Sequence, residues 1–203
     1  CIATAEQLHG KELSYNNILD ASAAWGLARE FGETAVCIIK HTNPCGAAIV
    51  ADGDVAEAFR RARATDPVSA FGGIVASNRP ISAAMAEELG EMFLEAVVAP
   101  EFDAAALTIL QKKKNLRLLR GPGGSVAAGG EPGIVPGVAP GAFFGGGATP
   151  RWEMRNVVGG FLLQEPDQSS ESVAQGKTVT RRVPTAEEYR DLAFAWTVCK
   201  HVK

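Results

Sequence analysis

The sequence predicts an α/β domain whose layers are built on a largely parallel sheet. Two observations carry this prediction: short, unbroken apolar runs of strand length alternate along the chain with segments in which apolar residues recur at helical spacing. The chain has 203 residues, of which 46% are hydrophobic and 21% charged. It is therefore long enough to bury a substantial core in one or two domains.

The first 120 residues supply most of the expected elements. Apolar residues at helical spacing predict a helix over residues 20–31, with Asp20 as its N-cap and Gly32 at its end. The apolar run at residues 35–39 predicts a strand buried on both faces, and a turn cluster follows at residues 41–46. The same criteria predict helices at residues 55–62, 82–90 and 103–109, a loop at residues 66–73, and strands at residues 74–76, 96–99 and 116–119.

The composition changes abruptly after this region. Residues 121–150 contain 11 glycines and 5 prolines, which predicts a loop or linker that is mobile unless something docks on it. The prediction divides the chain into a first α/β subdomain at residues 1–120, a linker at residues 121–150 and a continuation at residues 151–203.

Two strands and a helix are expected in the continuation. The strands are predicted at residues 159–164 and 177–183, and a capping box of Thr185 and Glu188 predicts the helix. Because this helix reaches Lys203 without a stop signal, we expect the chain to be cut short within it.

Charge and cysteine content narrow the class of protein. A net charge of −3 gives no electrostatic reason to expect nucleic acid or an anionic membrane as a partner. The four cysteines lack the short regular spacing of a disulfide framework, which favours reduced thiols in a cytosol. No apolar run approaches the roughly 20 residues of a membrane span, and the start of the chain does not resemble a signal peptide. A soluble, cytoplasmic protein is therefore expected.

Polar residues follow directly on the strand predicted at residues 35–39. Lys40 and His41 supply a cation and a group that titrates near neutral pH, while Asn43 adds an amide and Gly46 permits close backbone approach. Because α/β sheets place ligand sites where strands end, a functional site is one interpretation. A strand-ending turn that happens to contain polar residues is the other, and the pattern alone leaves both open.

A zinc site is a competing interpretation of the same segment. His41 and Cys45 are four residues apart, but deaminase-type sites combine His-x-Glu with Pro-Cys-x-x-Cys, and the glutamate and the second cysteine are missing here. We therefore expect no metal site. Farther along, Phe71 and Gly72 lie in a turn of small residues that either holds a flat ring or only packs a corner.

Six segments of the chain occur together in one known family. They read KELSYNNILD at residues 11–20, KHTNPCG at 40–46, DPVSAFGG at 66–73, VVAP at 97–100, RRVPT at 181–185 and FAWTVCKHVK at 194–203. In this order and spacing they closely resemble the aminoimidazole carboxamide ribonucleotide (AICAR) transformylase domain of the PurH family of bifunctional purine-biosynthesis enzymes. The resemblance covers the N-terminal part of that domain.

The resemblance implies a three-layer, cytidine-deaminase-like α/β fold without its zinc site. It implies catalytic roles for Lys40 and His41. The other site residues that it implies are the folate contacts Phe71 and Glu95 and the substrate contacts Asn43 and Gly72.

The implied reaction is formyl transfer from 10-formyltetrahydrofolate, as co-substrate, to the 5-amino group of AICAR, in a cytoplasmic homodimer. His41 would act as general base on the amine, and Lys40 would stabilise the oxyanion of the tetrahedral intermediate. The family's cyclohydrolase domain and the rest of its transformylase domain are absent from this sequence, so we expect a piece of a longer enzyme that is inactive alone. A non-catalytic binding module and a zinc-dependent hydrolase on the same fold stay open as alternatives.

Overall fold

The computed structural model describes residues 2–121, 152–167 and 173–203, and these form two compact units. Within the described part of the chain, the first unit comprises residues 2–121 and 201–203, and the second comprises residues 152–167 and 173–200. Apart from Gly121, the Gly/Pro-rich stretch that the sequence predicts to be a linker lies outside the described residues.

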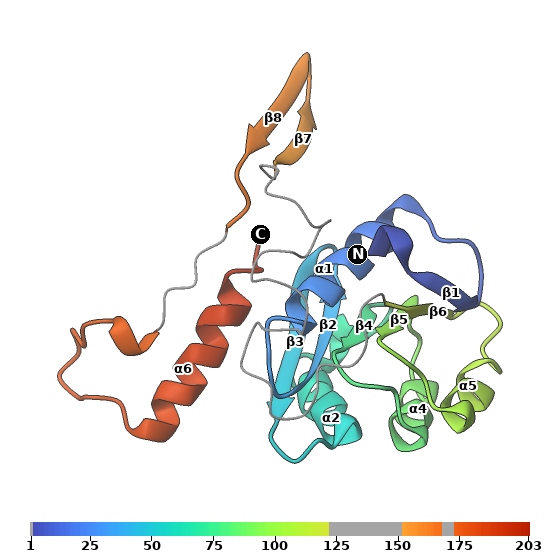
Figure 1. Ribbon diagram of the computed structural model, residues 1–203, viewed down its shortest axis with the longest axis horizontal. Coiled ribbons are helices and arrows are strands. Elements are labelled where there is room, and N and C mark those ends of the chain that lie inside the picture. Colours follow the sequence, from blue (N-terminus) through green and yellow to red (C-terminus); the bar gives the residue numbers. More distant parts are fainter. Residues whose placement is uncertain (1, 122–151, 168–172) are drawn as a thin grey trace. The chain divides into compact units, whose positions relative to one another are not determined.

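A six-stranded sheet forms the middle of the first unit (Figure 1). Its strands, in spatial order, are β1 (Glu6–His9), β6 (Arg117–Arg120), β5 (Ala96–Ala99), β4 (Ile74–Ser77), β2 (Thr34–Lys40) and β3 (Asn43–Val50). β4, β5 and β6 pair in parallel, whereas β2 is antiparallel to both β3 and β4, and β1 is antiparallel to β6. The sheet therefore runs mainly in one direction, as predicted, but β1 and β2 are reversed.

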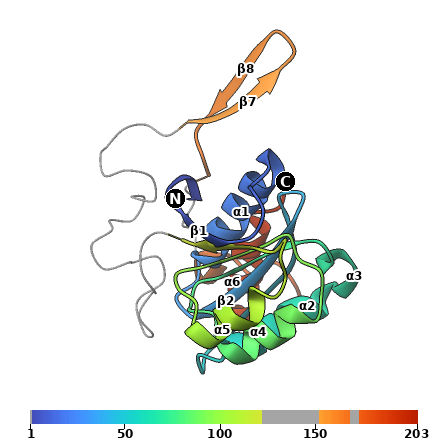
Figure 2. The same cartoon turned by 90° about the vertical axis from the view of Figure 1, so that its right-hand side faces the viewer.

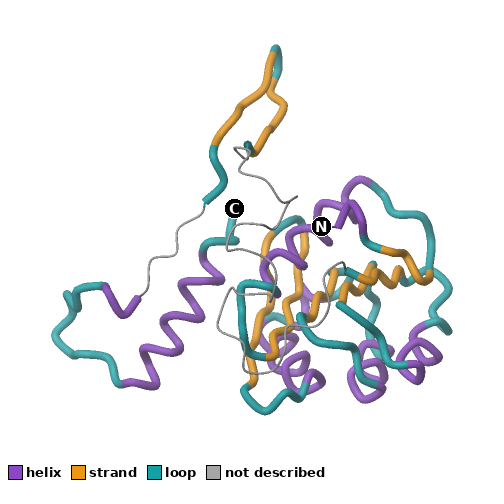
Figure 3. Tube along the Cα trace, in the orientation of Figure 1, coloured by secondary structure: helices purple, strands orange, loops and turns teal. Residues whose placement is uncertain are grey.

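Helices cover both faces of this sheet, which confirms the three-layer α/β prediction. α1 (Tyr15–Ala28) lies on one face and contacts β2, β4 and β5. The other face is covered by α2 (Val55–Thr65), α4 (Ala83–Gly90) and α5 (Ala104–Leu110), as Figure 2 shows most clearly. Figure 3 distinguishes the strands of the sheet from the helices that connect most of them along the chain.

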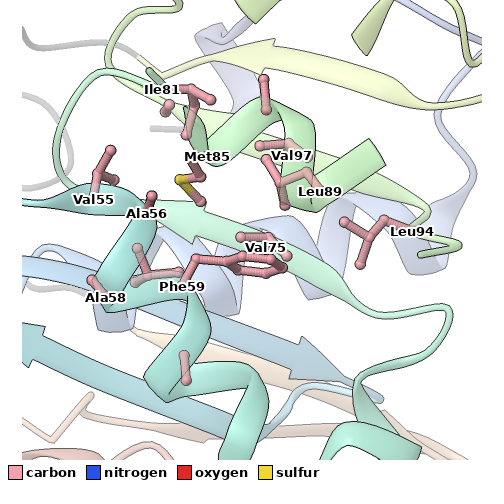
Figure 4. Close-up of a cluster of buried hydrophobic side chains, with 14 of the residues drawn as sticks. Val55, Ala56, Ala58, Phe59, Val75, Ile81, Met85, Leu89, Leu94 and Val97 are labelled. Carbon is pink, nitrogen blue, oxygen red and sulfur yellow. The ribbon is translucent and has the colours of Figure 1, made fainter. Parts of the chain in front are cut away.

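The main hydrophobic core lies between the sheet and the layer of α2, α4 and α5. Side chains of β2 alternate across the sheet, so Val36 and Ile38 point into this core while the equally buried Cys37 and Ile39 face α1. The ring of Phe59 from α2 is fully buried there (Figure 4). Other members of the cluster come from α4, from β4 and β5, and from the loops next to them: Val75, Ile81, Met85, Leu89, Leu94 and Val97.

The first helix begins earlier than predicted. α1 starts after Ser14, whose hydroxyl accepts a hydrogen bond from the backbone N–H of Asn17, while the Asn17 side chain accepts from the Ser14 N–H in a capping box. Asp20 is therefore not an N-cap but lies inside the helix. The cap predicted for the helix at residues 82–90 is confirmed, since Ser82 caps α4.

The turn cluster predicted at residues 41–46 is also shorter than expected. Only His41 and Thr42 form a turn, and the residues after them form the edge strand β3. Proline is tolerated here because β3 lies at the edge of the sheet and has an irregular register between Ile38 and Ile39 of its partner, where Pro44 pairs. The loop predicted at residues 66–73 contains the short helix α3 (Pro67–Ala70).

The second unit contains a hairpin and a helix. The hairpin pairs β7 (Glu153–Val157) with β8 (Gly160–Gln164), and every residue of both strands is exposed. α6 (Ala186–Cys199) has the predicted capping box at Thr185, but residues 177–183 form no strand. The chain also has short 3₁₀ turns at Ile2–Thr4 and Val173–Gln175. In the described part of the chain, no helix is long and apolar enough to cross a membrane.

Candidate active site

The predicted catalytic pair lies at the tip of the β2–β3 hairpin (Figure 1), where Lys40 is the last residue of β2 and His41 is the first residue of a two-residue turn. Lys40 pairs with Asn43 across the hairpin, which leaves His41 and Thr42 as the two turn residues. Both have left-handed backbones, with φ of 54° and 62°. Asn-Gly sequences usually fill such turns because side chains with a Cβ are strained there. The Lys40–His41 pair is therefore carried by an unusually constrained backbone.

Asp20 of α1 accepts hydrogen bonds from both backbone N–H groups of this turn. Its Oδ2 lies 3.1 Å from the His41 nitrogen, and its Oδ1 lies 2.7 Å from the Thr42 nitrogen. The Thr42 hydroxyl donates to the His41 carbonyl oxygen at 2.7 Å. These hydrogen bonds engage the backbone of the turn, and the His41 side chain stays exposed.

Asn43 is predicted to contact substrate, but both polar atoms of its side-chain amide form hydrogen bonds with backbone groups of this chain. Its Nδ2 donates to the His41 carbonyl oxygen at 3.1 Å, and its Oδ1 accepts from the Lys203 backbone N–H at 2.7 Å. Near the same end of the chain, His201 Nε2 lies 3.2 Å from Glu30 Oε1. The structure therefore gives Asn43 a role in holding the turn, and its contact with substrate stays a prediction.

The side chain of Lys40 links the hairpin to the second predicted site segment. Its Nζ donates to the Phe71 carbonyl oxygen at 2.9 Å. Asp66, at the start of α3, lies close enough to interact electrostatically with this ammonium group. Hydrogen bonds from the Ser69 side chain and backbone lower the pKa of Asp66, so that carboxylate stays ionised beside Lys40.

Phe71 forms an exposed aromatic pair with Phe93, a residue that the sequence pattern does not single out. Their ring centroids lie 5.4 Å apart with an interplanar angle of 44°, and their exposed fractions are 59% and 47%. Gly72 has a φ of 74°, which favours glycine, and its N–H donates to the Phe93 carbonyl oxygen at 2.9 Å. Two large rings thus remain accessible beside Lys40.

Glu95 lies at the same end of the sheet as Lys40, where β2 finishes and β4 and β5 begin. The register of β2, β4 and β5 places Lys40, Gly73 and Glu95 in one row, so the backbones of Lys40 and Glu95 are about 10 Å apart, two strand spacings. The buried guanidinium of Arg117 donates to Glu95 Oε2 at 2.7 Å and to the Glu12 carbonyl oxygen at 2.9 Å. The Glu95 side chain is 37% exposed, so it can accept a further hydrogen bond from a ligand.

Cys45 is the residue that the zinc interpretation pairs with His41. Its Sγ donates to the Ile38 carbonyl oxygen at 3.5 Å, and burial raises the pKa of the thiol, which disfavours the thiolate that binds metal. No group of three or more histidine, cysteine or acidic residues that could hold a metal occurs among the described residues.

The structure brings the predicted site residues together at one end of the sheet, although they come from separate segments of the chain. The hairpin carries Lys40, His41 and Asn43, the loop before β4 carries Phe71 and Gly72, and Glu95 precedes β5 in the same row. Because β2 is reversed, its carboxyl end lies beside the amino ends of β4 and β5. Lys40 and His41 thus follow the carboxyl end of β2, as expected, whereas Phe71 and Glu95 come before the amino ends of β4 and β5.

Three residues contact the predicted site residues at this end of the sheet but are not predicted to do so from the sequence pattern: Asp20, Phe93 and Arg117. Asp20 is predicted to be an N-cap, because a carboxylate at the start of an apolar helical pattern is the usual sign of one. Phe93 and Arg117 carry no local motif, so only the pairing of strands far apart in sequence reveals them.

Comparison with known proteins gives a consistent result along the whole chain. The model of the family described as AICARFT/IMPCHase bienzyme matches residues 1–203. The chain is 47% identical to the bifunctional purine biosynthesis protein PurH of Magnetococcus marinus over 202 residues, which cover 100% of this chain and 34% of that protein. It is also 47% identical to PurH of Desulfitobacterium hafniense and 49% identical to PurH of Rhodospirillum rubrum, over 100% of this chain and 35% and 34% of those proteins. The chain thus spans about a third of the length of these relatives.

Proposed function

This chain belongs to the AICARFT/IMPCHase bienzyme family, and we propose that it carries the catalytic pair of the formyl-transfer reaction in a longer purine-biosynthesis enzyme. In this proposal the formyl group moves from N10 of 10-formyltetrahydrofolate to the 5-amino group of AICAR, within a cytoplasmic homodimer that also has IMP cyclohydrolase activity. The observation that carries the proposal is that Lys40, at the end of β2, precedes His41 on a constrained turn and contacts the Phe71 segment.

His41 acts as the general base. The amine nitrogen of AICAR attacks the formyl carbon and loses a proton as the new C–N bond forms. Imidazole suits this step because it titrates near neutral pH, and the exposed His41 side chain is accessible to a substrate amine. The oxyanion then re-forms the carbonyl as the bond from the formyl carbon to N10 of the folate breaks. The electron pair goes to N10, which takes up the proton that His41 removed from the amine, and tetrahydrofolate leaves.

Lys40 stabilises the negative charge that develops on the formyl oxygen in the tetrahedral intermediate. An ammonium group has three N–H donors, and the contact with the Phe71 carbonyl oxygen uses one of them. This contact orients Nζ while leaving donors for the oxyanion. Loss of one such donor typically costs about 3 kcal/mol of transition-state stabilisation.

The aromatic pair and Glu95 serve to bind the folate. Phe71 offers an exposed ring face, and Phe93 supports it from the segment before β5. A flat pteridine gains about 0.5–1.5 kcal/mol from such ring contacts beyond the area it buries. Arg117 holds the Glu95 side chain, and the carboxylate of Glu95 can accept a hydrogen bond from an N–H group of the pteridine at the same end of the sheet.

The test is a hybrid enzyme in which this chain replaces the matching third of the Magnetococcus marinus relative. We expect His41→Ala and Lys40→Ala each to lower kcat/KM for formyl transfer by two or more orders of magnitude. His9→Ala is the matched control, because His9 lies on β1 at the opposite side of the sheet. The far-UV circular dichroism spectrum and melting temperature of each variant, compared with those of the unmodified hybrid, serve as the measure of folding. Near-normal formyl transfer in either site variant would disprove the role assigned to that residue.

A further inference from the structure

The turn that follows Lys40 and begins with His41 does not have the sequence that its backbone favours. His41 and Thr42 both have a Cβ, and Thr42 is also β-branched, yet both have positive φ. Residues of this kind rarely adopt that conformation unless the surrounding structure enforces it. Something outside the turn must therefore hold it in place.

The Asp20 carboxylate is placed to do this. Its two oxygens separately accept the His41 and Thr42 N–H groups, at 3.1 and 2.7 Å. In this turn conformation one carboxylate can therefore accept both N–H groups. Asp20 itself sits on a rigid base, because Ala21, Ala24 and Leu27 of the same helix are fully buried against the sheet. The helix thus fixes the carboxylate, and the carboxylate fixes the turn.

We propose that Asp20 is a positioning residue that holds the His41–Thr42 turn in its left-handed conformation and so sets where Lys40 and His41 are presented. The catalytic consequence rests on the proposed function, whereas the effect on the turn does not. An ionised carboxylate is needed because both oxygens act as acceptors. An asparagine at this position would keep one acceptor and turn an NH₂ group toward the second N–H.

A glycine substitution separates this role from a general effect on stability. Glycine adopts positive φ without strain, so Thr42→Gly should make the turn less dependent on Asp20. The matched control is Asp54, whose Oδ1 accepts the Ala56 and Glu57 N–H groups at 2.9 and 3.1 Å at the start of α2, away from this turn. Asp54→Ala removes a comparable pair of bonds without touching the hairpin tip.

The first experiment is NMR spectroscopy of this chain in the wild type, Asp20→Ala, Asp20→Asn, Thr42→Gly, Asp20→Ala/Thr42→Gly and Asp54→Ala forms. In Asp20→Ala we expect the His41 and Thr42 amides to exchange with solvent at least about tenfold faster and the Lys40–Asn43 cross-strand NOE to weaken. Asp20→Asn should give a smaller change. The double variant should recover the NOE, and Asp54→Ala should retain it. An unchanged NOE and unchanged exchange in folded Asp20→Ala would overturn the proposal.

The second experiment measures formyl transfer in the hybrid enzyme. We expect Asp20→Ala to lower kcat by about 10- to 100-fold with little change in KM, and Thr42→Gly in that background to restore at least half of the loss on a logarithmic scale. If Asp20→Ala disturbs the turn but leaves kcat unchanged, the link to catalysis is wrong. If the wild-type hybrid lacks formyl transfer altogether, the proposed function fails, while the NMR result still decides the role of Asp20.

Discussion

Replacing Gly46 by alanine should strongly destabilise the first unit. Gly46 lies in β3, directly beneath the end of α2, and a Cβ at this position would lie 2.1 Å from the Ala62 carbonyl oxygen and 3.0 Å from its carbonyl carbon. Both atoms belong to the helix backbone, so no side chain can rotate away. The strand and the helix would have to separate by roughly 1 Å to accept the methyl group.

The size of the effect follows from what that separation disturbs. α2 contributes Ala58, Phe59 and Ala62 to the core, all fully buried, and moving the helix loosens their contacts with the sheet. Overpacking usually costs about 1–3 kcal/mol, and a backbone clash with no flexible neighbour should reach the top of this range, at about 3 kcal/mol. The hairpin would shift with the strand, so the turn at its tip would also lose its fixed position.

Urea unfolding followed by far-UV circular dichroism provides the assay. With a slope of about 1–3 kcal/mol/M, a loss of about 3 kcal/mol lowers the midpoint by roughly 1–3 M. Gly26→Ala is the matched control. Gly26 lies inside α1, and no atom of the described residues outside its own helix backbone lies within 4 Å of where a Cβ would be, so alanine there should stabilise the helix by about 0.5–1 kcal/mol. The reasoning is refuted if both variants have the same stability as the wild type.

Two further predictions concern polar contacts. Asn78 is buried and its side chain binds three backbone groups of residues 31–35, so Asn78→Leu should lower the free energy of unfolding by about 3 kcal/mol or more, and a melting temperature within about 2 °C of the wild type would count against this. In the second unit, hydrogen bonds from the Arg182 guanidinium and, to a smaller extent, from Thr185 lower the pKa of Glu188 from 4.5 to about 2. A depressed carboxylate pKa stabilises the start of α6 above pH 4.5, and this is lost as the pH falls toward 2. Arg182→Met should raise that pKa toward 4.5 in a carboxylate NMR titration, and no rise would rule out the contact as its cause.

Elements with a buried, periodic face could be predicted from the sequence. β2 is buried on both faces and has a continuous apolar run, whereas α2 is buried on one face and has apolar residues at helical spacing. The strands that the pattern does not predict, β1, β3 and β7, lie at sheet edges or are exposed, so their sequences carry polar residues and turn signals such as Asn43-Pro44. The segment at residues 177–183 has strand-like residues but no partner strand among the described residues, and a strand does not form without one.

The candidate site was only partly predictable, for a related reason. Lys40, His41 and Phe71 belong to recognisable local motifs, and these motifs led to the family that the comparisons support. The groups that hold them belong to distant segments: Asp20 lies 21 residues before His41, and Arg117 lies 22 residues after Glu95. Local sequence shows which chemical groups are present, whereas strand pairing decides which of them meet.

The reversed direction of β2 explains why the candidate site combines a hairpin tip with segments that precede strands. In a sheet whose strands are all parallel, ligands bind at the carboxyl ends, where loops leave the strands. Here one loop leaves a strand, at His41, and two loops enter strands, at Phe71 and Glu95. The connection that leaves β2 is a hairpin with only two turn residues, which leaves little freedom for its backbone. The reversed strand between β3 and β4 therefore brings this tight turn, with its two left-handed residues, to the end of the sheet where the chain enters β4 and β5.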